Sequence, residues 1–194
     1  MDINNLILNK YCPICKSENI QDKKKIQSKH IEINLVFSLK KCLDCRHRFL
    51  SKFPTEKNLE KLYKSNSKYV FGHELDEEYE KNKFKDGGFK SVLPFNEHWI
   101  FNFININQAG EYFEIGPGLC RLYKTFYEKN WHCEGLDLQP FIKAPGIIDD
   151  LEKIKDNSKD VAVALDVIEH TINPNKFLSE LNNKLKIDGK VFLS

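Results

Sequence analysis

Four cysteines near the start of the chain form two pairs with the spacing of metal ligands. Two residues separate Cys12 from Cys15 and Cys42 from Cys45, and 26 residues lie between the pairs. Each pair brings two thiolates to one tight turn, so the set can supply the four sulfur ligands that Zn²⁺ prefers. Such a closed site leaves no open coordination position, which predicts a structural ion. The alternative is a redox-active pair, but the motif occurs twice here without a thioredoxin-like pattern.

A second group of residues could hold a nucleoside-containing ligand. Gly116 and Gly118 stand where the apolar segment 111–115 gives way to a helical pattern. Glycines let the backbone approach a ligand closely, and a helix N-terminus offers N–H groups. Asp137 closes the next apolar segment, where a carboxylate can accept hydrogen bonds from both hydroxyls of a ribose. NAD and S-adenosylmethionine both fit these residues.

Two residues distinguish the two ligands. The dinucleotide-binding fingerprint has a third glycine where this chain has Arg121. Glu114 is unfavourable beside a pyrophosphate, but its carboxylate suits the ammonium and sulfonium groups of S-adenosylmethionine. The loop therefore favours S-adenosylmethionine over NAD.

After residue 109, apolar segments alternate with amphipathic ones. This pattern predicts the strands and helices that must position these residues. An uninterrupted apolar run at 161–165 is typical of a strand covered on both faces. Strands that alternate with helices predict an α/β fold, a doubly wound and mainly parallel Rossmann-like sheet. The expected strands are 111–115, 131–138, 146–148, 161–165 and 190–193, a turn at 188–189 precedes the last, and the expected helices are 119–129 and 175–185.

The first half of the chain has a different pattern. The cysteines and an alternating run at 31–37 predict a small zinc ribbon built on a β-hairpin. A capped helix beginning near Thr55 and an amphipathic helix over 94–106 predict a helical connector, with Phe95 and Trp99 in its buried stripe. The expected domains are a zinc ribbon at 1–53, the connector at 54–108 and the Rossmann-like domain at 109–194.

The motifs of the second half resemble those of class I S-adenosylmethionine-dependent methyltransferases. Residues 114–118 resemble the first motif of this family and residues 135–137 the second. Residues 149–151 resemble the turn that contacts the adenine, and residues 165–170 the segment after the fourth strand.

The first half resembles members of this family that have an amino-terminal zinc ribbon. In those members the second cysteine pair leads into an apolar strand, a proline and a helix with a Leu…Tyr pattern. Here these features are Phe49-Leu50, Pro54 and the segment 59–63.

The chain departs from the family pattern at three places. Cys120 replaces a third small residue of the loop, and Lys159 stands where an aromatic residue commonly supports the fourth strand. The family's sheet has seven strands, and this sequence ends on the fifth. Cys120 and Cys133 are expected to be free thiols.

The resemblance implies methyl transfer from S-adenosylmethionine to a small-molecule acceptor such as a sugar or another metabolite. His170 is the candidate general base, because it follows the fourth strand on the ligand side of such sheets, and a purely structural histidine is the alternative. The residues expected at the cofactor site are Glu114, Gly116, Gly118, Asp137, Leu138, Asp150, Leu151 and Asp166.

Composition narrows the class of protein. The 194 residues are 41% hydrophobic and carry 30 Lys and Arg against 28 Asp and Glu, so a folded chain with a near-balanced charge is expected. This balance argues against an electrostatic nucleic-acid binder. No apolar run approaches the roughly 18 residues of a membrane helix, and the start lacks the pattern of a secretory signal. A cytoplasmic location with reduced thiols is therefore expected.

Two other functions compete with an active methyltransferase. A truncated, non-catalytic remnant would at most bind the cofactor, and the apolar fifth strand at 191–193 would leave an edge open to self-association. An RNA-binding or RNA-modifying zinc-ribbon protein would need a broad basic face.

Overall fold

The computed structural model describes residues 6–27, 36–55, 57–58, 88–138, 140 and 142–194. Most of the run expected as a strand at 31–37 and the segment 59–63 lie outside these residues. The chain divides into two compact units. The ribbon unit comprises residues 1–66 and 172–175, and the α/β unit comprises 67–171 and 176–194.

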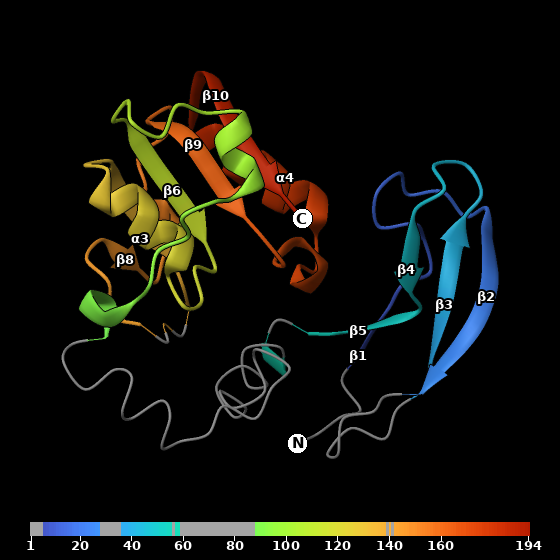
Figure 1. Cartoon of the computed structure of the whole chain (residues 1–194). Helices are drawn as coiled ribbons and strands as arrows, with labels where there is room; N and C mark the ends of the chain where they lie inside the picture. Colours follow the sequence, from blue (N-terminus) through green and yellow to red (C-terminus); the bar gives the residue numbers. More distant parts are fainter. Residues whose placement is uncertain (1–5, 28–35, 56, 59–87, 139, 141) are drawn as a thin grey trace. The chain divides into compact units, whose positions relative to one another are not determined.

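The ribbon unit is built on antiparallel strands. β2 (Ile20–Gln27), β3 (Val36–Cys42) and β4 (Arg48–Leu50) form one sheet in that order, with the long β2–β3 pair visible in Figure 1. β1 (Leu6–Leu8) pairs with β5 (Lys52–Pro54) in a separate two-stranded sheet. The expected hairpin between the two cysteine pairs is therefore present as β2 and β3.

The α/β unit contains one five-stranded sheet in which all neighbouring strands are parallel. Its order is β10-β9-β6-β7-β8, so the first strand along the chain lies in the middle. This order is that of a doubly wound sheet and confirms the expected Rossmann-like class. The strands are β6 (Glu111–Ile115), β7 (His132–Leu136), β8 (Ile147–Ile148), β9 (Lys159–Ala164) and β10 (Leu185–Leu193).

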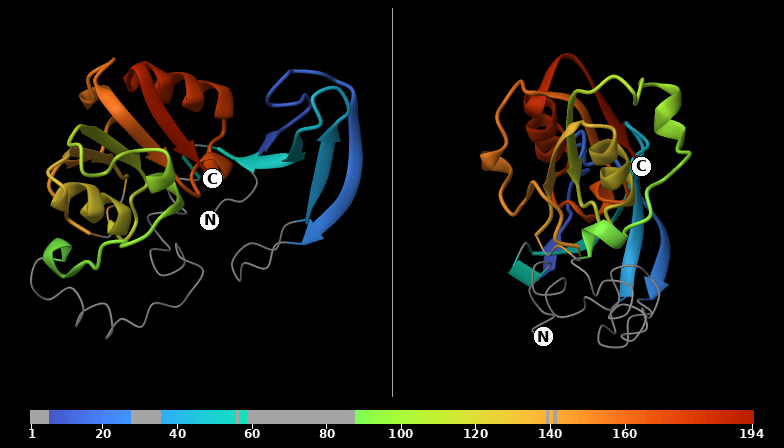
Figure 2. Two further views of the ribbon diagram at one scale, coloured as in Figure 1. Left: turned by 45° about the horizontal axis from the view of Figure 1, so that its top comes forward. Right: turned by 60° about the vertical axis from the view of Figure 1, so that its left-hand side comes forward.

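Helices cover both faces of this sheet (Figure 1, Figure 2). α3 (Arg121–Glu128) packs on one face, and α4 (Pro174–Lys184) packs on the other through Leu181. Side chains of a strand alternate between faces, so Tyr112 and Phe113 of β6 enter different cores. Four consecutive residues of β9, 161–164, are buried, which confirms the strand expected to be covered on both sides. Within the described ranges, no helix is long and apolar enough to cross a membrane.

The expected helix over 94–106 is wrong. The only helical element within 94–106 is the 3₁₀ turn η3 (Trp99–Asn102), and another 3₁₀ turn, η2 (Phe89–Ser91), precedes this region. The hydroxyl of Thr125 in α3 accepts a hydrogen bond from the backbone N–H of Phe95 at 2.9 Å and donates to its carbonyl at 3.1 Å. A tertiary contact therefore takes the backbone groups that a helix would have used.

The aromatic residues of this region are less buried than the helical pattern suggested. Trp99 is 46% exposed and stands edge-on to Phe192 of β10, with ring centroids 5.6 Å apart. Phe95 is partly buried and lies under the guanidinium of Arg121, 4.2 Å from the ring centroid. Each aromatic ring therefore packs where the extended chain places it, and the rings form no single helical stripe.

The last strand is longer than expected. Residues 188–189, expected as a turn, lie inside β10, where the pairing with β9 is irregular between Leu185 and Lys190. Asp188 has a left-handed backbone, and a Cβ on Gly189 would lie 2.9 Å from the carbonyl oxygen of Lys159. The turn-forming residues thus produce a bulge that lets β10 pass close to its neighbour.

Candidate functional site

The predicted cofactor residues gather at the carboxyl edge of the sheet. The N–H of Gly116 donates to the carbonyl of Leu136 at 2.9 Å, and that of Asp137 donates to Ile148 at 3.0 Å. These bonds keep the chain aligned just beyond the ends of β6, β7 and β8. The loops that follow these strands therefore lie side by side, at the edge where ligands bind in doubly wound sheets.

Gly116 lies where the strand order reverses, between β7 and β9. Its φ is +65°, and a Cβ added there would lie 2.9 Å from the side chain of Val167 in the loop after β9. A larger residue would strain the backbone and displace that loop. Gly116 therefore allows the loops after β6 and β9 to approach each other at the predicted binding edge.

Glu114 is buried beneath the glycine loop. The Tyr112 hydroxyl donates to its carboxylate at 2.8 Å, and the backbone N–H of Tyr123 in the first turn of α3 donates as well. Cys120, at the N-cap of α3, has a left-handed backbone and makes no side-chain capping bond, so Glu114 takes part of that role. Burial raises the pKa of Glu114 to about 7. A neighbouring cation would favour the ionised carboxylate.

The loops after β7 and β8 present the residues expected around an adenosine. Asp137 is half-buried at the end of β7, and Leu138 beside it is 69% exposed. The Asp150 carboxylate accepts a hydrogen bond from the N–H of Glu152 at 2.9 Å and caps η4 (Leu151–Lys153). An exposed leucine beside a carboxylate offers a surface for an apolar ring next to a polar group.

The loop after β9 holds the two remaining predicted residues. Asp166 is exposed, has a left-handed backbone, and its N–H donates to the carbonyl of Ser194 at 3.2 Å. His170 is exposed and ends η5 (Ile168–His170), three residues after Val167, whose side chain lies against Gly116. The structure thus places His170 in a loop next to the glycine turn.

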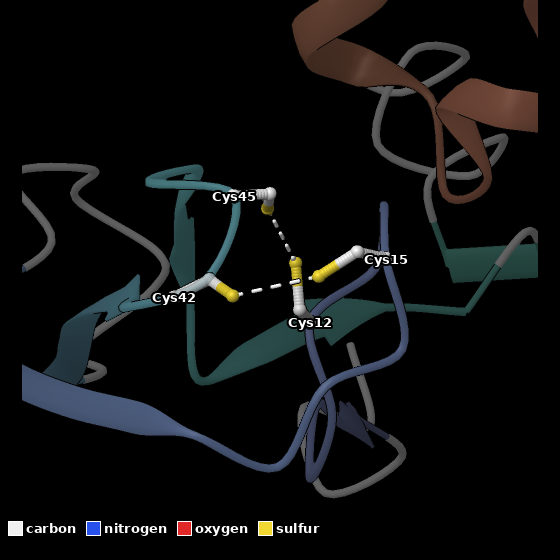
Figure 3. Close-up of side chains that lie close together, drawn as sticks. All are labelled: Cys12, Cys15, Cys42 and Cys45. Atoms are coloured by element: carbon white, nitrogen blue, oxygen red, sulfur yellow. Dashed lines mark hydrogen bonds between the residues drawn. The ribbon is translucent and has the colours of Figure 1, made fainter.

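The four cysteine sulfurs converge in the ribbon unit (Figure 3). They all lie within 4.8 Å of one another, and the Cys12–Cys45 and Cys15–Cys42 sulfurs are 3.5 Å apart. A tetrahedral zinc site with bonds of about 2.3 Å has sulfur–sulfur edges of about 3.8 Å. The cluster therefore has the donor set and the dimensions of a four-cysteine zinc site.

The two cysteine turns share one local geometry. Lys16 and Arg46, which follow the second cysteine of each pair, both have left-handed backbones, with φ of 62° and 65°. Asp44 joins the turns, because its carboxylate accepts hydrogen bonds from the Ser17 hydroxyl and from the Asn19 amide, the latter at 2.8 Å. These bonds hold the pairs facing each other.

The thiol pKa values show why this cluster needs a cation. The backbone N–H of Cys45 donates to the Cys42 sulfur and lowers the pKa of that thiol to about 7. The N–H of His47 favours the Cys45 thiolate, but burial and the neighbouring thiols outweigh it and hold the Cys45 pKa at about 12. Four adjacent thiolates therefore require a positive charge between them.

A buried ion-pair network was not predicted from the sequence. The Lys159 side chain is 2% exposed, and its ammonium pairs with Glu111 of β6 at 3.1 Å and with Glu134 of β7. His132 contacts the same Glu111 carboxylate at 2.7 Å. Lys159 thus replaces the family's aromatic residue with charge pairing across three strands. Glu111, His132 and Glu134 lie close enough to hold a metal ion, but the Lys159 ammonium already forms ion pairs with both carboxylates.

Cys120 and Cys133 are buried free thiols, as expected. Burial raises the pKa of both to about 12, so neither is an activated nucleophile.

Comparison with known families assigns the α/β unit. Residues 113–193 match the family model described as a methyltransferase domain. The matched segment runs from β6 to β10 and includes every loop of the predicted cofactor site. No curated protein matches the chain.

Two solved structures are similar to this chain. A Methanococcus maripaludis protein assigned as an S-adenosyl-L-methionine-dependent methyltransferase is 16% identical, with a TM-score of 0.39 over 71% of this chain and 61% of that one. Haemonchus contortus phosphoethanolamine N-methyltransferase 2, solved with phosphomonomethylethanolamine and S-adenosylhomocysteine, is 16% identical, with a TM-score of 0.47 over 88% of this chain and 46% of its own. The chain therefore spans less than two thirds of either protein, and the assignment depends on the family match.

Proposed function

We propose that this chain binds S-adenosylmethionine and transfers its methyl group to a small-molecule acceptor, because residues 113–193 match a methyltransferase-domain family model and the sheet has the doubly wound strand order. The observation that carries the proposal is the convergence of Glu114, the Gly116 turn and Asp137 at one edge of a sheet with this strand order.

Each loop has a distinct role in this proposal. The backbone at Gly116 and Gly118 approaches the methionine portion of the cofactor, and Asp137 accepts hydrogen bonds from the ribose hydroxyls. Leu138 packs against the adenine. Asp150 and Leu151 hold its other edge, with the capping bond to Glu152 keeping this turn in place.

The chemical step needs little from the protein besides positioning. The cofactor supplies a methyl group already activated by a sulfonium, so transfer is an in-line displacement that depends on orientation and exclusion of water. Glu114 would hold the cofactor's ammonium as a carboxylate. Asp166 and His170 lie in the loop beside this turn, and His170 would accept the proton of an acceptor that must lose one.

Calorimetric titration of S-adenosylmethionine into the zinc-loaded chain tests the site. Micromolar binding is expected, and Asp137→Ala should weaken it at least about tenfold. Asp156→Ala is the matched control, because this exposed carboxylate pairs with Lys184 at 2.6 Å, precedes the amino end of β9 and has no assigned role at the cofactor. Absence of binding to a folded protein, or equal losses in both variants, would contradict the proposed site.

A binding protein without transferase activity is the second candidate. Detection of S-adenosylhomocysteine formed with any small-molecule acceptor would exclude this candidate. Cofactor binding without turnover across a broad acceptor screen would favour it.

For the ribbon unit, we propose a structural Zn²⁺ ion held by its four cysteines. The spacing of the four sulfurs supports this proposal. Metal analysis should find one zinc per chain, and Cys45→Ser should release it. Cys133→Ser, in a buried thiol of the other unit, should leave the zinc content unchanged.

A further inference from the structure

The near-zero net charge conceals two units of opposite charge. Residues 1–55 contain 11 Lys and Arg against five Asp and Glu, whereas the remaining residues contain 19 against 23. The first segment is therefore strongly basic and the rest acidic. Such asymmetry between halves is typical of a chain that uses one part to bind a polyanion.

Where the structure describes the ribbon unit, its basic side chains have no acidic partners. Among its described residues, no lysine or arginine forms an ion pair with a carboxylate. Asp44, one of its few acidic residues, accepts its hydrogen bonds from Ser17 and Asn19 instead. Unpaired cations on a small unit raise the local concentration of anions.

A bulge in β2 places the Lys24 side chain on the same face of the sheet as Leu39. Asp22 pairs with Lys40, but the next pair is Lys24 with Leu39, so Lys23 is an extra residue in β2. Because side chains alternate with a period of two, this insertion moves Lys24 to the face of Leu39.

We call the face of the three-stranded sheet that carries Leu39 and Lys24 the Phe37 face. It lies opposite the side on which Cys42, Phe49 and Ile20 form the small core of the ribbon. Its apolar side chains are half-buried, Lys24 and Arg48 are exposed, and Lys41 is half-buried. The members, which strand pairing places on one face, are Gln21, Lys24, Ile26, Phe37, Leu39, Lys41, Arg48 and Leu50.

We propose that the Phe37 face binds single-stranded nucleic acid, with its cations on the phosphates and the Phe37 ring stacked on a base. Lysine and arginine on phosphates supply sequence-independent affinity, and aromatic rings stack on unpaired bases. A duplex would match the charge but would keep its bases away from the ring. This inference does not depend on methyl transfer, and it reverses the expectation drawn from the net charge.

Fluorescence anisotropy of a labelled oligouridine with the zinc-loaded full chain tests the proposal. Three phosphate contacts predict a slope of about −2 in log K against log salt. Replacing Lys24, Lys41 and Arg48 together with Gln should weaken binding at least about tenfold and flatten this slope. The matched control replaces the exposed Lys129, Lys143 and Lys155 of the α/β unit with Gln, removes the same charge, and should change affinity by less than about twofold.

Phe37→Ala distinguishes stacking from charge alone. Loss of one stacked base should weaken binding about fivefold or more with an unchanged salt slope. Far-UV circular dichroism and zinc content verify that the variants are folded. Equal losses of affinity in the two triple variants would overturn the proposal. So would tighter binding of a duplex than of the single strand, or equally tight binding of polyglutamate or anionic vesicles.

Discussion

The ribbon unit and the α/β unit achieve a defined fold by different means. The described residues of the ribbon bury three side chains in its core, those of Cys12, Cys42 and Phe49, whereas the α/β unit buries two large clusters on opposite faces of its sheet. A core as small as the ribbon's cannot offset the entropy of ordering its chain. We therefore expect the proposed zinc site to supply most of its stability, while that of the α/β unit comes from packing and a few buried charges.

Metal removal is the strongest test of this contrast. A zinc site of this type supplies about 10 kcal/mol or more of folding free energy, so a strong chelator should unfold the ribbon and leave the α/β unit folded. Limited proteolysis with mass spectrometry would show cleavage confined to the ribbon. Simultaneous loss of both units would mean that their stabilities are coupled.

Lys159 provides the corresponding test in the α/β unit. Lys159→Met would leave the Glu111 and Glu134 carboxylates, which are 34% and 26% exposed, without their cation, and because water solvates them in part we expect destabilisation of about 2 kcal/mol. Lys186→Met, which breaks an exposed pair with Asp160, should cost less than about 1 kcal/mol. Urea unfolding of both variants measures the difference, and similar midpoints would show that the buried network contributes little.

Glu114 makes the stability of the α/β unit depend on pH. Its pKa is raised from 4.5 to about 7, so the folded state binds the proton more tightly than the unfolded state. Its contribution is fully present below pH 4.5 and is lost as the pH rises through 7, a change of about 3 kcal/mol. Unfolding of wild type and Glu114→Gln across this range measures it. A difference between the two proteins that stays constant with pH would contradict this account.

The same residue links cofactor binding to proton release. If the cofactor's ammonium requires the carboxylate, affinity should rise as the pH approaches 7 and should fall again above about 8, where an α-amino group loses its proton. Calorimetry in buffers of different ionisation enthalpy detects the released proton. Glu114→Gln should remove the acidic limb of this profile and leave the basic limb in place.

The smallest expected effect concerns the open edge of β10. An apolar edge strand favours pairing with a second copy, so we propose weak self-association of the wild type and its loss in Ile187→Lys. Leu93→Lys, at a similarly exposed apolar residue outside any strand, is the control. Sedimentation velocity over a range of concentrations compares the association of the wild type with that of the two variants. A wild type that stays monomeric would exclude self-association through β10.

The sequence predicted the parts of the fold that local patterns determine. The strand at 111–115 has the predicted bounds because its apolar run ends at a glycine turn. The helix at 94–106 was wrong, since its periodicity carries no information about the hydroxyl of Thr125, which bonds to the backbone of Phe95. Local pattern fails where a distant side chain takes the backbone hydrogen bonds.

The candidate site could likewise be predicted from the sequence only in part. Gly116 and Asp137 could be placed because the ends of parallel strands share one edge. The partners of Glu114 could not, because its hydrogen bonds with Tyr112 and Tyr123 depend on how α3 docks on the sheet. The basic ribbon was visible in the sequence but disappeared when charge was summed over the whole chain.

The buried Lys159 network also bears on the order in which the sheet assembles. Its carboxylates come from β6 and β7, but its ammonium comes from β9, which the chain reaches later and which docks on the other side of β6. An intermediate that pairs β6 with β7 alone holds two carboxylates without their cation, so complete burial of this region must wait for β9. β9 therefore brings the cation to the two carboxylates, so the ion pairs at the middle of the sheet are complete only when all three strands are in place.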